Sequence, residues 1–156
     1  MCHYCGCRQI PLIRDYIAEH EHVLDLGERA LEEMGRGALD DAQATVDQMR
    51  ADLRSHWQGE EDGVFALMRG DELYRQHIDP LIAEHRELDE LLRTMDVRDE
   101  HQLAVLQEQV AELRVHISKE EDGIFPVTLV EFSGPEWDAA IDAWRRAHPG
   151  QQLIQD

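Results

Sequence analysis

The sequence predicts an all-α protein, an up-down-up-down four-helix bundle followed by a short fifth helix. Ala, Leu, Glu, Arg and Gln are abundant and strand-like runs are nearly absent, which favours helices. Apolar residues recur at steps of three and four over four long stretches, the period of an amphipathic helix. Short connections between such stretches favour antiparallel neighbours, and 156 residues are expected to form one domain.

The first two helices are expected to form a hairpin. The first begins at Pro11, where a proline is tolerated, and stops at Gly35 and Gly37. Its inner face carries Ile13, Ile17, His20, Leu24 and Leu31. The second runs from about Leu39 to Met68. Its apolar seam reads Ala42, Val46, Met49, Leu53, His56, Glu60, Val64 and Leu67.

The third and fourth helices are expected to form a second hairpin. The third begins either at the Asp79–Pro80 pair or, with a proline kink, near Asp71. The fourth follows Asp99 as N-cap. Their inner faces read Leu81, Ile82, His85, Leu88, Leu92 and Met95, and Leu103, Leu106, Val110, Leu113, His116, Glu120, Ile124 and Val127.

A short fifth helix starting at Pro135 is expected to pack on the end of the bundle. We divide the chain into a Cys-rich segment (1–9), the bundle domain (10–147) and a C-terminal tail (148–156).

Two strings occur twice in the chain. IAEH stands at 17–20 and again at 82–85, while HWQGEEDGVFA (56–66) and HISKEEDGIFP (116–126) share the pattern HxxxEEDG. Each copy places the shorter string on the first helix of a hairpin and the longer one on the second. The repeated unit is therefore a whole helical hairpin.

The polar residues of this repeat lie on the apolar seams. In each HxxxE string, the histidine and the glutamate share one helix face and aim at the same place. Burying such groups without a partner costs several kcal/mol per charge, a cost that a bound cation removes. One inward histidine is more often an ordinary core residue, but the repeated set predicts a metal site. The six candidate ligands are His20, His56, Glu60, His85, His116 and Glu120.

Other polar residues near these positions receive different expectations. Glu61, Asp62, Glu121 and Asp122 point elsewhere on their helices and are expected to be solvated or to support the ligands. His22 is placed on the outer face of the first helix. His3, His101 and His148 lie near the ends of elements, where surface positions are expected.

Histidine and carboxylate ligands suit first-row ions such as iron, manganese or zinc. Two glutamates from facing helices could each bridge two ions, as in di-iron bundles. Of roughly twelve positions on two six-coordinate ions, the six residues and one oxo or hydroxo bridge leave about two open. Dioxygen, peroxide or nitric oxide would bind there. Zinc would favour fewer ligands and a tetrahedral site.

Residues 12 to 131 resemble the hemerythrin-like HHE cation-binding family. The family places one histidine on helices one and three and HxxxE on helices two and four, and the six candidate ligands match this pattern. The resemblance implies a non-haem di-iron centre that binds oxygen or a related small ligand. Oxygen-carrying hemerythrins have a further histidine where this chain has Asp89, which is then a seventh ligand, a partner of an imidazole, or neither.

Three interpretations of function remain open. The leading one is a protein that binds or senses dioxygen, peroxide or nitric oxide at a di-iron centre. The absent histidine at Asp89 keeps open an enzyme that consumes peroxide or nitric oxide. The third is a zinc-binding or structural bundle.

The cysteines gather at the start of the chain. Cys2, Cys5 and Cys7 could meet one ion with His3 as fourth ligand. Alternatively, the segment is a flexible terminus with reactive thiols, or a redox or protein-binding element that serves the metal centre.

Charge and hydropathy restrict the partners. The net charge of −19 disfavours nucleic acids and anionic membranes and favours cations. No apolar run reaches the roughly 20 residues that span a bilayer, and the N-terminus lacks the apolar region of a secretory signal. A cytoplasmic protein is expected.

Overall fold

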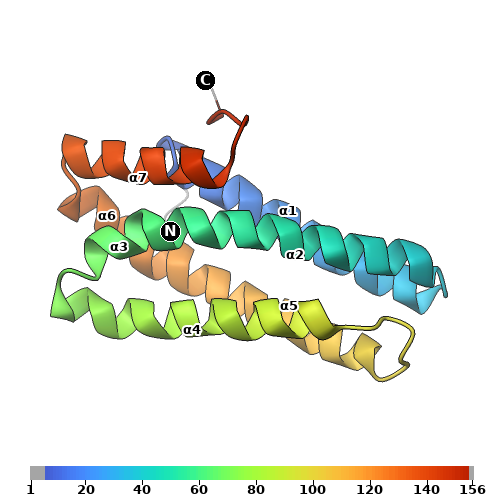
Figure 1. Ribbon diagram of the computed structural model, residues 1–156. Helices are drawn as coiled ribbons and strands as arrows, with labels where there is room; N and C mark the ends of the chain where they lie inside the picture. Colours follow the sequence, from blue (N-terminus) through green and yellow to red (C-terminus); the bar gives the residue numbers. More distant parts are fainter. Residues whose placement is uncertain (1–5, 155–156) are drawn as a thin grey trace.

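The computed structural model describes residues 6–154 and has the predicted all-α architecture (Figure 1). The four long helices are α1 (Ile13–Gly35), α2 (Leu39–Asp62), α4 (Glu72–Thr94) and α5 (Gln102–Lys119). The shorter elements are η1 (Cys7–Gln9), α3 (Val64–Met68), the π-helix η2 (Glu120–Ile124), α6 (Phe125–Glu131) and α7 (Gly134–Ala147). No strand occurs within the described residues, and none of their helices is long and apolar enough to cross a membrane.

The core of the bundle consists of two apolar clusters. One lies toward the connection between α1 and α2 and includes Val23, Met49, Leu92 and Leu106. The other lies toward the opposite end and includes Tyr16, Phe65, Ile78, Phe125 and Trp144. Along the chain, His20, Glu60, His85 and Glu120 fall between residues of the two clusters, and His56 and His116 precede the glutamates by one helical turn. The candidate ligands therefore occupy a polar layer enclosed by apolar packing on both sides.

The third helix begins at Glu72, so the start near Asp71 is right and the start at Asp79–Pro80 is wrong. The carboxylate of Asp71 accepts a hydrogen bond from the backbone N–H of Leu73 at 2.8 Å, which caps the helix. Pro80 lies inside α4, and Ile78 on the preceding turn is fully buried. Burial of this first part against the bundle offsets the missing N–H of the proline.

Both helices that carry an HxxxEEDG string change geometry where the string ends, although continuous helices were expected. The helix break at Gly63 separates α2 from α3. In the second copy, the N–H of Phe125 bonds to the carbonyl of Glu120, five residues back, and forms the π-helix η2. Pro126 has no N–H to continue the regular ladder. Such π-turns are frequent at functional sites.

The fifth helix, α7, lies along α2 rather than across the end of the bundle (Figure 1). Gly59 in α2 and Gly63 directly after this helix leave little space between α2 and α7. A Cβ atom at Gly63 would lie 3.2 Å from the Cβ atom of Ala143 and 3.3 Å from the carbonyl oxygen of Ala140, and one at Gly59 would touch the Cα atom of Trp144 at 3.5 Å. The chain after α7 then returns to the start of α1, where the N–H of Ile154 donates to Asp15 at 2.7 Å.

Candidate metal centre

The six candidate ligands come together in the buried polar layer, and each of the four long segments of the bundle supplies one or two of them. His20 comes from α1, His56 and Glu60 from α2, His85 from α4 and His116 from α5. Glu120 is the first residue of the π-helix. Both glutamates are fully buried, and none of the four histidines is more than 6% exposed.

The histidines form two pairs whose Nε2 atoms face each other. The Nε2 atoms of His20 and His56 lie 3.0 Å apart. The Nε2 atoms of His85 and His116 are also 3.0 Å apart. Each pair therefore directs two ring nitrogens at one point in the centre of the bundle.

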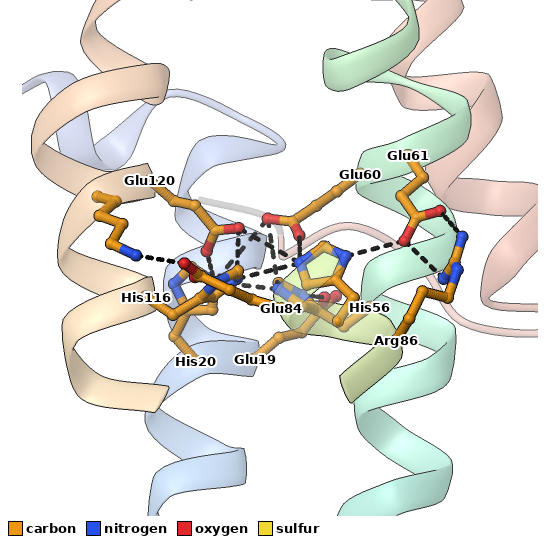
Figure 2. Close-up of polar contacts among 11 residues, drawn as sticks. Glu19, His20, His56, Glu60, Glu61, Glu84, Arg86, His116 and Glu120 are labelled. Atoms are coloured by element: carbon orange, nitrogen blue, oxygen red, sulfur yellow. Dashed lines mark hydrogen bonds and ion pairs between the residues drawn. The ribbon is translucent and has the colours of Figure 1, made fainter. Parts of the chain in front are cut away.

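The two glutamates contact both histidine pairs, and Figure 2 shows the carboxylates of Glu60 and Glu120 facing each other beside the histidine rings. Oε1 of Glu60 is 3.3 Å from Nε2 of His56, and Oε2 is 3.8 Å from Nε2 of His85. Oε1 of Glu120 is 2.9 Å from Nε2 of His116, and Oε2 is 3.2 Å from Nε2 of His20. Each carboxylate thus presents one oxygen to each histidine pair.

A carboxylate outside the centre contacts the other ring nitrogen of every histidine. The Nδ1–O distances are 2.7 Å for His56–Glu19, 2.8 Å for His85–Glu61, 2.7 Å for His116–Glu84 and 3.1 Å for His20–Glu121. An ionised carboxylate only accepts hydrogen bonds, so each Nδ1 carries a proton and donates. In the neutral ring, Nε2 then keeps its lone pair and points it inward.

The centre is consequently rich in electron pairs and poor in hydrogen-bond donors. Within residues 6–154, none of the four oxygens of Glu60 and Glu120 has a hydrogen bond of good geometry, and all four are buried. Buried carboxylates without partners are strongly unfavourable. Ligand atoms of His20, His56, Glu60 and Glu120 lie within 4.8 Å of one another, as do those of His85, His116 and Glu120. This buried cluster is able to hold a metal cation, and its donor types fit a first-row ion.

Without a metal ion, protons satisfy the same nitrogens. Burial acts to lower the pKa of His116, but Glu120 and Glu84 outweigh it and raise that pKa to about 9. Burial likewise opposes protonation of His56, whose pKa is nevertheless raised well above its usual value by Glu60 and Glu19. The pKa of Glu120 is held well below its usual range by His116, although burial acts to raise it.

The comparison with protein families agrees with this geometry. A family model described as "Hemerythrin HHE cation binding domain" matches residues 12–128, which include all six clustered side chains. The chain belongs to the hemerythrin HHE family. No curated protein and no solved structure gives a significant match to it.

Asp89 lies outside the metal centre of this hemerythrin domain. Its carboxylate accepts a hydrogen bond from Nε of Arg50 at 2.8 Å, and 29% of its side chain is exposed. It does not belong to either group of clustered ligand atoms. Of the roles considered for Asp89, the structure shows neither contact with an imidazole nor a place among the clustered ligands.

The Cys-rich segment is only partly described. Cys2, His3 and Cys5 lie outside the described residues, and Cys7 is disulfide-bonded. The thiolate site stays a prediction, and it requires Cys7 in its reduced form. Arg8, next to Cys7, donates to Glu121 at 2.7 Å and so connects this end of the hemerythrin domain to the carboxylate that holds His20.

Sequence reasoning missed part of the hemerythrin site. Glu19 and Glu84 were not singled out, although the repeated AEH strings place a glutamate directly before each histidine of α1 and α4. The surface position expected for His148 is wrong: this ring is 5% exposed and its Nε2 lies 3.4 Å from Glu19. The indole N–H of Trp144 donates to the same glutamate at 2.6 Å.

Proposed function

We propose that this hemerythrin domain holds two non-haem iron ions and binds or senses dioxygen, peroxide or nitric oxide. The observation that carries the proposal is the division of the buried donors into two histidine pairs joined by two carboxylates. One ion would be held by His20 and His56 and the other by His85 and His116. Glu60 and Glu120 would bridge them, because each has an oxygen on either side.

The four outer carboxylates, which contact the Nδ1 atoms of the histidines, support this assignment. They belong to Glu19, Glu61, Glu84 and Glu121. Metal-binding histidines usually donate their second N–H to a carboxylate or carbonyl, which fixes the ring and raises its basicity. All four histidines do so here. A histidine that serves only as core packing does not require a partner on both nitrogens.

Bound iron would supply a redox-active centre with open coordination positions for a small ligand. The chain's own residues shape the space around it. The two apolar clusters exclude bulk water above and below the polar layer. The rings of Trp57 and Phe65 stack against His85 at centroid distances of 4.9 and 5.9 Å and restrict its orientation.

The test is anaerobic loading with Fe²⁺, followed by iron quantitation and optical spectra before and after adding dioxygen, nitric oxide or peroxide. The proposal predicts about two irons per chain and a stoichiometric spectral change with at least one ligand. Sustained consumption of peroxide or nitric oxide would instead assign the enzymatic alternative. Retention of zinc with no spectral response to any ligand would overturn the iron assignment.

A further inference from the structure

The two halves of the metal centre differ in their covering, although the six ligands are arranged almost symmetrically. On the side of α1 and α2, the end of α7 covers Glu19, which contacts both Trp144 and His148. On the side of α4 and α5, the carboxylate of the equivalent residue Glu84 pairs with Lys119 and His116, and 36% of its side chain is exposed. One side is therefore closed by a helix and the other by a single lysine.

The repeat explains this difference. In the two HxxxE strings, Gly59 and Lys119 occupy the same position, directly before the glutamate. A Cβ atom at Gly59 would already lie 3.3 Å from the hydroxyl of Tyr16, 3.5 Å from the Cα atom of Trp144 and 3.6 Å from the ring of His148, which leaves no room for a long side chain such as that of lysine. At Lys119 a long side chain crosses to Glu84 instead. At this position of the repeat, the first hairpin therefore contacts α7, and the second hairpin carries a lysine that pairs with Glu84.

A cavity of about 380 Å³ lies between α4 and α5, and both Glu84 and Lys119 line it. His85 and His116, both candidate ligands, form part of its wall. Glu84, Glu87 and Glu112 also line it, and Lys119 is the only lysine or arginine in the lining. The three carboxylates outnumber the cationic groups of the lining even when the ring of His116 is protonated, so the potential in the cavity favours an incoming cation.

We propose that Fe²⁺ enters the metal centre through this cavity and that the Glu84–Lys119 pair closes the entrance. The inference rests on the proposed function, since it assigns a route to the same metal centre. Lys119 is 48% exposed at its side chain, and exposed ion pairs of this kind contribute little to stability. The lysine can therefore swing into solvent without disturbing the bundle, which exposes the edge of His116 to the incoming ion.

The test compares metal uptake in two matched variants by stopped-flow mixing with Co²⁺, an optically visible stand-in for Fe²⁺. Val115 is 58% exposed and lines the cavity, whereas Val130 is 82% exposed on α6 and does not line it. Val115→Trp should slow uptake by about tenfold or more and leave the final number of ions unchanged. Val130→Trp should load at the wild-type rate. Lys119→Ala should load several-fold faster.

The outcomes separate the entrance from the metal centre itself. The proposed entrance is wrong if Val115→Trp, Val130→Trp and the wild type load at equal rates and Lys119→Ala loads no faster. Failure of the wild-type protein to take up any ion would instead overturn the proposed function. Circular dichroism of each metal-free variant checks that the bundle is folded. The Lys119→Ala variant, at an exposed site, tests the entrance without an added tryptophan.

Discussion

His20 and His56 face each other through their Nε2 atoms at 3.0 Å, while both rings donate their Nδ1 protons outward to carboxylates. Two neutral rings in this arrangement direct lone pairs at each other, which is favourable only when a cation or a proton lies between them. His85 and His116 repeat the relationship in the second hairpin. Metal ions and protons therefore compete for the same four nitrogens.

Metal affinity should consequently rise with pH. His116, with a pKa raised to about 9 in the metal-free protein, is charged at neutral pH, and metal binding must release that proton. We expect the affinity to increase about tenfold per pH unit for each proton released, until the pH passes that pKa. Isothermal titration calorimetry in buffers of different ionisation enthalpy counts these protons. Binding without proton release would contradict the prediction.

The stability of the metal-free protein should change with pH in the opposite direction. The pKa of His116 is raised from 6.5 to about 9, so its pairing with Glu120 and Glu84 stabilises the fold fully below about pH 6.5. This contribution is lost as the pH rises through about 9. Urea unfolding of metal-free protein should therefore give a lower midpoint at high pH than at pH 6.5. The Glu120→Gln variant should show a smaller difference between the midpoints at these two pH values.

Replacing one carboxylate that contacts both histidine pairs should weaken the binding of both metal ions. Glu120 belongs to both groups of clustered ligand atoms, so Glu120→Gln should lower metal affinity by more than about a hundredfold. Asp89→Asn is the matched control, because Asp89 pairs with Arg50 outside the centre. It should leave both the stoichiometry and the affinity unchanged in equilibrium dialysis. Full retention of two ions by Glu120→Gln would remove this residue from the ligand set.

The outer carboxylates should tune affinity without setting the number of ions. Glu84→Gln keeps an acceptor for the Nδ1–H of His116 but removes its charge, and should weaken metal binding by about 10- to 100-fold. Glu108→Gln, on the exposed face of α5, controls for the change in net charge. Competition with a chelator measures both affinities. Equal affinities for the two variants would show that Glu84 has no role in holding the ring.

The docking of α7 should depend on one of two equivalent glycines. A Cβ atom at Gly63 would lie 3.2 Å from the Cβ atom of Ala143 and 3.3 Å from the carbonyl oxygen of Ala140, both in α7, and 2.7 Å from the carbonyl oxygen of Gly59 in α2. A Cβ atom at Gly123 meets nothing within 4 Å among the described residues. Gly63→Ala should destabilise the protein by about 1–3 kcal/mol. Gly123→Ala, at the same place in the repeat, should change stability by less than about 0.5 kcal/mol. Thermal unfolding of both metal-free variants compares them directly, and equal midpoints would contradict the packing described for α7.

The gathering of the six side chains could be predicted because helical periodicity alone assigns His56, Glu60, His116 and Glu120 to inward faces. The repeat then indicated that the two hairpins contribute equally. Periodicity does not show which neighbour a residue contacts across the bundle. The bonds of Glu19 to His56 and of Glu61 to His85 join different helices and emerged only from the fold.

The asymmetry of the site was harder to predict. Gly59 and Lys119 occupy equivalent positions in the repeat, which the sequence shows. The contact of Gly59 with α7 could not be predicted, because α7 lies far along the chain. His148 was expected at the surface because it follows the last helix, yet that helix ends against Glu19. The start of α4 was ambiguous because Pro80 is compatible with either a helix start or a kinked interior.

The most direct test of the account is an anaerobic titration of metal-free protein with Fe²⁺, in which bound iron per chain is measured at equilibrium. Two histidine pairs that both contact Glu60 and Glu120 predict saturation at about two ions per chain, with both ions lost together in Glu120→Gln. Saturation at one ion, or binding of two ions that survives this substitution, would contradict the shared-carboxylate centre.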